Sequence, residues 1–201
     1  MSYFIDPSDK DLIQNIRNLQ PYPGYCIFLD IVGSTELKDL ETAKWIIYIY
    51  NTFANTKTYF WNLSDPIKSV GDELMLYFPE HNLNNEDALS IFAGLASVAK
   101  SNEVYSKDVK ISATYCNNVY DITFIKNTKD VYGKDIDLTV RLLSIAQSNE
   151  IIMNEEFLNK LRESYNRIGN KEQFPEVEQI VGPWPHKFKG FKESVNVYKL
   201  P

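Results

Sequence analysis

A carboxylate inside an apolar segment is the first feature of this chain that could do chemistry. Asp30 interrupts the apolar run 25–32, and Gly33, Ser34 and Thr35 follow that run directly. A buried carboxylate costs free energy unless a partner or a metal ion compensates its charge. The Gly-Ser-Thr turn leads into a predicted helix, whose free N–H groups favour phosphate. The segment suits a metal–triphosphate site, although Asp30 alone would equally suit a strand end that caps a turn.

A second acid, Asp72, follows Gly71 in a predicted tight turn between two apolar strands, 66–69 and 73–78. Taken alone, it would be an ordinary solvated turn residue. If its hairpin lies beside the strand that carries Asp30, the two carboxylates could share divalent cations. Hard oxygen ligands of this type suit Mg²⁺ or Mn²⁺.

Two further segments combine charged residues with a predicted helix or loop. Asp137 and Arg141 are four residues apart, so they share one face of a predicted helix. Lys189 lies in the basic loop 187–191, just before the last predicted strand. Each segment also has a simpler interpretation. Asp137 and Arg141 could form an ordinary surface ion pair, and 187–191 could be a solvated basic loop.

The elements that must position these residues alternate along the chain. Hydrophobic periodicity and turn residues predict one α+β domain without internal repeats or linkers. The predicted helices are 9–19, 35–63, 84–100, 134–146 and one that Asn154 caps; the predicted strands are 25–32, 66–69, 73–78, 109–115, 120–125, 151–153 and 195–200, with 166–181 rich in loops.

Composition excludes several classes of function. The 201 residues include 21 Lys and Arg against 27 Asp and Glu, a net charge of −6, which disfavours binding to a nucleic acid polymer. The longest apolar run, 45–50, is too short to span a membrane, and the first 20 residues lack a signal-peptide pattern. We therefore expect a soluble cytoplasmic protein without a membrane partner. Cys26 and Cys116 lie in apolar surroundings and are expected to be reduced core residues.

In order and spacing, the four segments resemble the motifs of the class III nucleotidyl cyclases, the adenylate and guanylate cyclase catalytic domains. The resemblance covers nearly the whole chain, so we expect a catalytic domain at 25–201 after an N-terminal lead-in at 1–24. It implies an α+β fold with a ferredoxin-like core and a mostly antiparallel sheet flanked by helices. The similar segments are 28–35 (first metal aspartate), 68–72 (base-specifying residue and second metal aspartate), 130–142 (second base-specifying position and transition-state helix) and 189–190 (phosphate-binding lysine).

The resemblance also implies an active homodimer that acts on a nucleoside triphosphate and shares each active site between two chains. One chain would supply the metal and phosphate ligands, and the other would supply the base-reading and charge-stabilising residues. The residues implied are Asp30, Asp72 and the Ile31 carbonyl for two divalent cations, Mg²⁺ or Mn²⁺; the backbone from Val32 through Gly33 and Ser34 to Thr35 for the phosphates; Lys68 and Asp130 for the base; and Arg141 and Lys189 for charge on the phosphates. Asp137 departs from the family pattern, because an Asn that orients the ribose usually stands there.

The identity of the base stays open at this level. Within the family, a Lys and Asp pair such as Lys68 and Asp130 marks adenine, yet cytosine and uracil can satisfy the same donor and acceptor. Pocket size would decide, and the bulky side chains that could shrink the pocket are Phe28, Tyr48, Tyr50 and Tyr132. A small cyclase with divergent motifs also resembles the pyrimidine cyclases of anti-phage defence, which make cyclic UMP or cyclic CMP. We favour UTP or CTP, with ATP and cyclic AMP as the alternative.

Three other interpretations compete with an active cyclase. Asp137 is compatible with an inactive cyclase-like module that only binds nucleotide. The hairpin segment 70–74 is faintly similar to the Gly-Gly-Asp/Glu-Glu-Phe hairpin of diguanylate cyclases, but it has one glycine and leaves Asp130 and Arg141 unexplained. A generic α+β binding module is the third.

Overall fold

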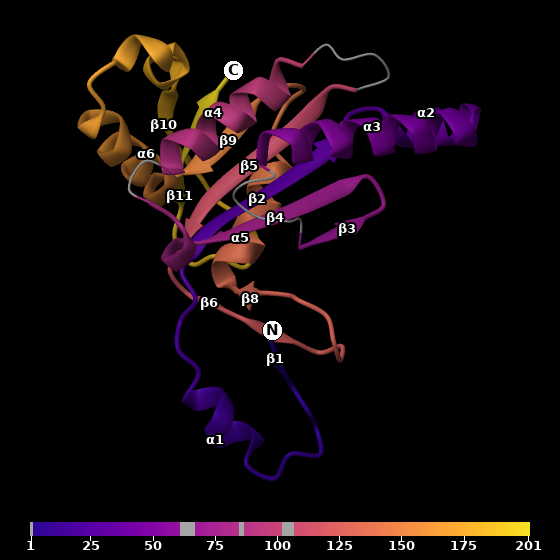
Figure 1. The fold of residues 1–201 in the computed structure, drawn as a ribbon, viewed down its shortest axis with the longest axis vertical. Helices are drawn as coiled ribbons and strands as arrows, with labels where there is room; N and C mark the ends of the chain where they lie inside the picture. Colours follow the sequence, from indigo (N-terminus) through magenta and orange to yellow (C-terminus); the bar gives the residue numbers. More distant parts are fainter. Residues whose placement is uncertain (1, 61–66, 85–86, 102–106) are drawn as a thin grey trace.

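A computed structural model describes residues 2–60, 67–84, 87–101 and 107–201. Within these residues, a seven-stranded sheet forms the centre of the molecule, in the order β10-β11-β9-β5-β2-β4-β3 (Figure 1). The strands are β2 (Gly24–Ile31), β3 (Lys68–Val70), β4 (Glu73–Pro79), β5 (Val109–Cys116), β9 (Ile151–Asn154), β10 (Val181–His186) and β11 (Val195–Leu200).

The middle of the sheet is built from the strands that are apolar on both faces. In β2, every residue except Asp30 is buried, because β4 and β5 flank this strand and helices cover both of its faces. β5 and β9 run parallel, and the other adjacent pairs run antiparallel. The expected fold class, a mostly antiparallel sheet flanked by helices, is confirmed.

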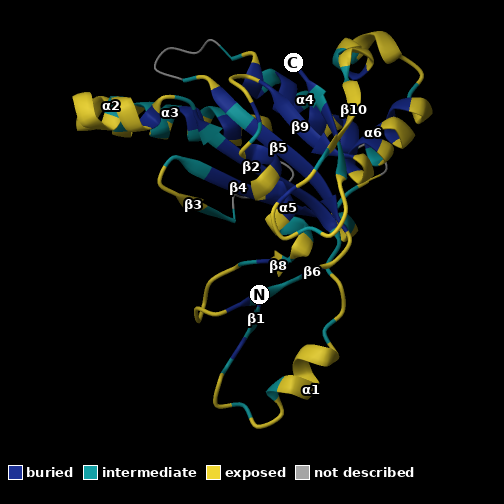
Figure 2. Ribbon diagram, turned by 180° about the vertical axis from the view of Figure 1, so that it is seen from behind, coloured by how far each residue is buried: buried dark blue, intermediate teal, exposed yellow. Residues whose placement is uncertain are grey.

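Helices cover the two faces of the sheet unequally. One face packs on α3 (Thr42–Phe60), α4 (Asp87–Ala99) and α6 (Glu155–Arg167), and it holds the larger apolar core. The other face packs on α5 (Lys134–Leu143), whose Leu138, Leu142 and Leu143 are buried. Figure 2 shows the central strands buried and α1 and α2 largely exposed.

The N-terminal lead-in extends from one end of the sheet and folds back on a distant segment. It contains β1 (Tyr3–Phe4) and α1 (Leu12–Arg17), which has no buried residue and is shorter than the predicted helix 9–19. β1 pairs in parallel with β7 (Ile122–Thr123). Beside it, β6 (Val119–Tyr120) pairs with β8 (Tyr132–Gly133). The predicted single strand 120–125 is therefore wrong, because the chain divides at Asp121 between two small sheets.

The predicted helix 35–63 is also wrong as a single element. It consists of α2 (Ser34–Leu40) and α3, separated at Glu41, whose backbone is extended (φ −157°, ψ 96°). The Trp45 indole N–H donates to the Ser34 hydroxyl at 2.8 Å, which ties the first turn of α3 to the first turn of α2. This tertiary contact holds the break, and no Gly or Pro marks it in the sequence. Residues 61–63 lie outside the described residues.

The remaining boundaries shift by a few residues. Asn154 caps α6 as predicted, since its side chain accepts the N–H of Phe157. β3 begins at Lys68 and α4 at Asp87, later than the predicted starts at 66 and 84, and residues 66 and 85 lie outside the described residues. The segment predicted to be loop-rich contains short 3-10 helices and leads into β10, a strand that was not predicted. The 3-10 helices of the chain are Glu80–Asn82, Lys171–Gln173 and Pro175–Gln179 within the described ranges.

Cys26 and Cys116 are free and buried, as predicted. Among the described residues, no helix has the length and apolar character needed to cross a bilayer.

Candidate active site

The two predicted base-reading residues meet in space although 62 positions separate them in the chain. The Lys68 ammonium on β3 donates to both carboxylate oxygens of Asp130, at 2.8 and 2.9 Å. The Lys68 side chain is 38% exposed and that of Asp130 is 15% exposed, so the pair remains open to a ligand. The hairpin of β3 and β4 places the lysine, and the segment before β8 places the acid.

An aromatic side chain borders this ion pair. The Lys68 ammonium lies 5.4 Å from the centre of the Tyr132 ring. The Phe124 ring contacts the same ring edge-on, with the two ring centres 4.9 Å apart. Burial and the negative charge of Asp130 raise the pKa of the Tyr132 hydroxyl. Phe28 is on the same face of the sheet, two strands from Lys68 and buried, because Lys68 pairs with Met75 and Met75 pairs with Phe28. Tyr48 and Tyr50, in contrast, lie on α3.

The two predicted metal aspartates also come together, at the edge where β2 ends. Asp72 occupies the two-residue turn between β3 and β4, after Gly71 in the left-handed conformation (φ 64°). Asp30 pairs across the sheet with Glu73 on one side and with Lys110 on the other. Desolvation by burial, followed by the charges of Asp72 and Glu73, raises the pKa of Asp30 to about 6.

This arrangement fits divalent cations. A carboxylate that is half-buried beside a second carboxylate is destabilised by like charge, and a cation between them would remove that repulsion. The donors are hard oxygens, which suit Mg²⁺ or Mn²⁺. Among the described residues, Asp, Glu, His and Cys form no metal-binding group of three or more. Further ligands would therefore have to come from backbone carbonyls, water or the substrate.

The turn after Asp30 begins a helix, as predicted. Gly33 is left-handed (φ 69°), and Gly33, Ser34 and Thr35 open α2, where N–H groups have no partner within the helix. The Val32 N–H does not belong with them, because it donates to the Asp108 carbonyl at 2.9 Å. The expected phosphate cradle thus reduces to Gly33, Ser34 and Thr35. Ile31 is the last residue of β2 and is buried.

The charged residues predicted to act on the phosphates are exposed. Asp137 and Arg141 lie on the outer side of α5, and Lys189 lies in the loop between β10 and β11. Within the described part of the chain, none of these three forms a side-chain hydrogen bond or ion pair, so the predicted surface pair of Asp137 with Arg141 is absent. One chain therefore does not bring Arg141 and Lys189 into contact with the aspartates.

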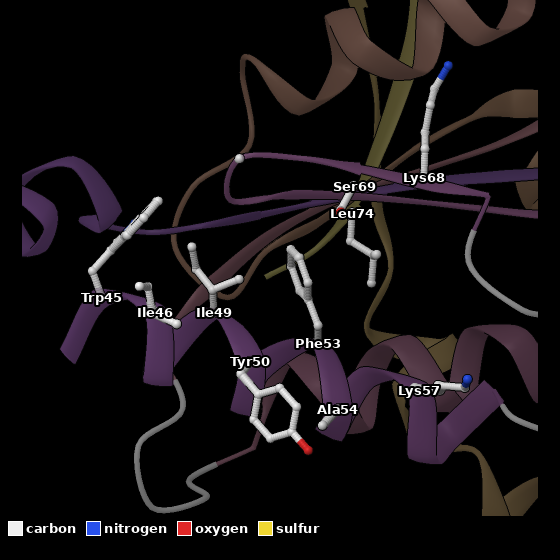
Figure 3. A pocket seen from close by; sticks show the side chains of 11 residues that line it. Trp45, Ile46, Ile49, Tyr50, Phe53, Ala54, Lys57, Lys68, Ser69 and Leu74 are labelled. Atoms are coloured by element: carbon white, nitrogen blue, oxygen red, sulfur yellow. The ribbon is translucent and has the colours of Figure 1, made fainter. Parts of the chain in front are cut away.

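An apolar groove of about 810 Å³ lies between α3 and the β3–β4 hairpin, and its lining includes Lys68, Ser69 and Leu74 of the hairpin. Figure 3 shows Trp45, Ile49 and Phe53 rising from α3 toward Leu74, while the Lys68 side chain points away from the groove. The groove and the Lys68–Asp130 pair therefore adjoin at Lys68, whose ammonium is turned away from the groove.

Sequence reasoning missed several neighbours of the site. Glu73 and Lys110 flank Asp30 only because of strand register, which no local pattern encodes. Phe124 carries no local signal of a role, and its place beside Tyr132 depends on how the segment 121–131 folds back. The position of Glu73 directly after Asp72 is the one sequence signal that could have placed it near Asp30.

Solved structures of adenylyl and guanylyl cyclases share this fold. The adenylyl cyclase CyaB from P. aeruginosa matches with a TM-score of 0.70 at 18% identity, over 92% of this chain and 96% of that one. The guanylate cyclase domain of RhGC from Catenaria anguillulae, in complex with GTP, matches with a TM-score of 0.69 at 12% identity. The match covers 90% of this chain and 98% of that one. A structure of adenylate cyclases from Trypanosoma brucei in their monomeric state matches with a TM-score of 0.70 at 12% identity. The match covers 89% of this chain and 88% of that one.

No protein-family model and no curated protein sequence matches the chain. Identities this low establish the fold and nothing finer. The chain therefore has the fold of a class III cyclase catalytic domain, and its chemistry must be inferred from its own residues.

Proposed function

We propose that the chain is a nucleotidyl cyclase, which converts a nucleoside triphosphate into a 3′,5′-cyclic nucleotide and pyrophosphate. The observation that carries the proposal is the bidentate pair of Lys68 with Asp130 on a cyclase fold. Asp30 and Asp72 support it from the end of the neighbouring strands, where their charges interact. The first pair would read the base, and the second pair would bind the metal ions.

Asp30, Asp72 and the Ile31 carbonyl would hold two divalent cations, Mg²⁺ or Mn²⁺. Bound there, the cations would supply Lewis acidity that lowers the pKa of the ribose 3′-hydroxyl and neutralises the triphosphate. The N–H groups of Gly33, Ser34 and Thr35 would donate to phosphate oxygens at the start of α2.

Arg141 and Lys189 would stabilise negative charge on the phosphates, and Arg141 suits this role because its guanidinium is a rigid fork of donors. Asp137 would lie near the ribose, one turn before Arg141. Since these residues do not contact the aspartates of their own chain, a second copy would complete each site. Apolar side chains that a partner could cover are exposed along α2, α3 and the hairpin: Leu40 is 84% exposed, Tyr50 71% and Val70 67%.

The substrate we favour is a pyrimidine triphosphate, UTP or CTP. Tyr132 lies against Lys68, so a bulky ring borders the base-reading pair on one side. A pyrimidine needs less space than a purine and can still satisfy one donor and one acceptor. The product would then serve as a signal in anti-phage defence, as the resemblance to pyrimidine cyclases implies.

The deciding experiment incubates the purified protein with ATP, GTP, CTP or UTP and Mn²⁺, and resolves the products by chromatography. We expect cyclic UMP or cyclic CMP. Cyclic AMP as the main product would replace the pyrimidine assignment with an adenylate cyclase. If no triphosphate yields a cyclic product, the chain is not a cyclase, and nucleotide binding without turnover would identify an inactive module.

A further inference from the structure

The hydroxyl of Ser2 binds the backbone of a base-reading residue. Ser2 is 6% exposed, and its Oγ donates to the Asp130 carbonyl at 3.2 Å and accepts the Asp130 N–H at 3.0 Å. A hydroxyl has one donor and two acceptor positions, so this single group can satisfy both backbone polar groups of Asp130. No other contact in the described residues joins the lead-in to Asp130 by hydrogen bonding.

β1 holds Ser2 in place by pairing with the segment that leads to Asp130. The Tyr3 N–H donates to the Asp121 carbonyl at 2.9 Å, and the Ile5 N–H donates to the Thr123 carbonyl at 2.8 Å. The Lys126 ammonium lies 5.3 Å from the centre of the Phe4 ring. The lead-in therefore contacts the start, the middle and the end of the segment 121–130.

Apart from the lead-in, this segment is held by local hydrogen bonds around Thr123 and Thr128 and by the contact of Phe124 with Tyr132, and none of these reaches Asp130. Residues 124–129 are exposed, and in Figure 1 the segment projects beyond the end of the main sheet together with β1. Val131, the next residue, is 1% exposed and packs in the core under α5. The core thus fixes the chain after Asp130, and Ser2 fixes Asp130 itself.

The position of the Asp130 backbone decides where its carboxylate lies. Oδ1 accepts the Val131 N–H at 2.9 Å and the Lys68 ammonium at 2.8 Å, a geometry that leaves little freedom. Hydrogen bonds weaken steeply as distance and angle depart from the optimum, so a small displacement of Asp130 would weaken its contact with a base.

We infer that Ser2, carried on β1, is a positioning residue that holds Asp130 in the geometry required to read the base of the nucleotide. The inference rests on the proposed cyclase function. It assigns the N-terminal lead-in a part in substrate selection, although none of its residues belongs to the cyclase-like motifs.

The test compares Ser2→Ala with Ser2→Thr, which keeps the hydroxyl, and with the control Ser8→Ala. Ser8 belongs to the same lead-in, but its hydroxyl binds only Asp6, at 2.7 Å. We expect Ser2→Ala to raise KM for the preferred triphosphate about fivefold and to leave kcat within about twofold, the loss typical of a neutral hydrogen bond. Ser2→Thr and Ser8→Ala should both keep KM at the wild-type value.

Amide hydrogen exchange on the protein without nucleotide gives a second readout. Ser2→Ala should speed exchange at Asp130, whose N–H loses its acceptor, and should leave the protection of β2 unchanged. If the wild type is active and Ser2→Ala changes neither KM nor exchange at Asp130, the positioning role is overturned and the cyclase function stands. Faster exchange with an unchanged KM overturns it too, because the contact is then structural alone. A wild type that makes no cyclic product overturns the proposed function and, with it, this inference.

Discussion

Among single residues, Asp30 is the acid of the proposed cation site whose charge the fold disfavours. Desolvation raises the pKa of Asp30 to about 6, with Asp72 and Glu73 adding to the effect and Lys110 opposing it. The folded chain then binds a proton between about pH 4 and pH 6 that the unfolded chain does not bind. The free energy of unfolding therefore falls as pH rises through this window. Above about pH 6 the folded chain carries the full cost of an ionised Asp30.

Asp30→Asn should remove this penalty. Without divalent cations, we expect the variant to unfold about 2–4 °C above the wild type at pH 8, and at the same temperature near pH 4. This difference corresponds to about 1 kcal/mol, because solvent screens a half-exposed group. Thermal unfolding measured from pH 4 to pH 8 checks it, with the exposed Asp39→Asn as the control. Mn²⁺ should stabilise the wild type but not Asp30→Asn, and equal stabilisation of both proteins would exclude Asp30 as a ligand.

Lys68 should affect the choice of base rather than the need for metal. Lys68→Glu replaces a donor by an acceptor beside Asp130, so a base that offers an acceptor loses its partner. We expect the ratio of kcat/KM between triphosphates to change about tenfold or more, while the dependence on Mn²⁺ concentration stays the same. Lys10→Glu, an exposed charge reversal in the lead-in, is the control. An unchanged ratio would mean that Lys68 does not contact the base.

Among the secondary-structure elements, α5 presents its catalytic candidates by burying the opposite side. Leu138 and Leu142 pack against the sheet, which turns Asp137 and Arg141 outward. The Asp135 carboxylate accepts the N–H groups of Asn117 and Asn118 at 2.9 and 3.0 Å and so anchors the first turn. The helix is thus a rigid support for an exposed guanidinium.

Arg141→Ala should lower kcat about 100- to 1,000-fold, the usual loss when one donor to transition-state charge is removed. Arg141→Lys should recover little, because an ammonium cannot form the same bidentate contact. Steady-state kinetics checks both variants, and Arg162→Ala, an exposed arginine on α6, should stay within about twofold of the wild type. Wild-type turnover in Arg141→Ala would place the catalytic charge elsewhere.

In the molecule as a whole, one chain carries both halves of the proposed site but does not join them. The carboxylate pair, Asp30 and Asp72, has no contact with Arg141 or Lys189 in the described residues. Two copies related by a two-fold axis would form two equivalent composite sites, each with one half from each chain.

Complementation between inactive variants tests this arrangement. Asp72→Ala and Arg141→Ala should each be inactive yet still dimerise, as sedimentation can verify. A mixture that has exchanged subunits should recover about a quarter of wild-type activity, because half of the dimers are mixed and each mixed dimer has one intact site. Mixtures that remain inactive although mixed dimers form would show that each site lies within a single chain.

Local sequence was enough to identify the features that depend on neighbours along the chain. An acid inside an apolar run marked Asp30, a glycine before an acid marked the Asp72 turn, and helical spacing placed Asp137 and Arg141 on one face. These patterns are local because backbone conformation and the alternation of buried and exposed positions act over a few residues.

The meeting of distant residues, in contrast, became visible only in three dimensions. The folded chain joins Lys68 to Asp130, flanks Asp30 with Glu73 and Lys110, breaks the long helix at Glu41, and places Ser2 against Asp130. Strand order, register and the packing of the lead-in depend on cooperative contacts over the whole chain, and short sequence patterns do not encode them.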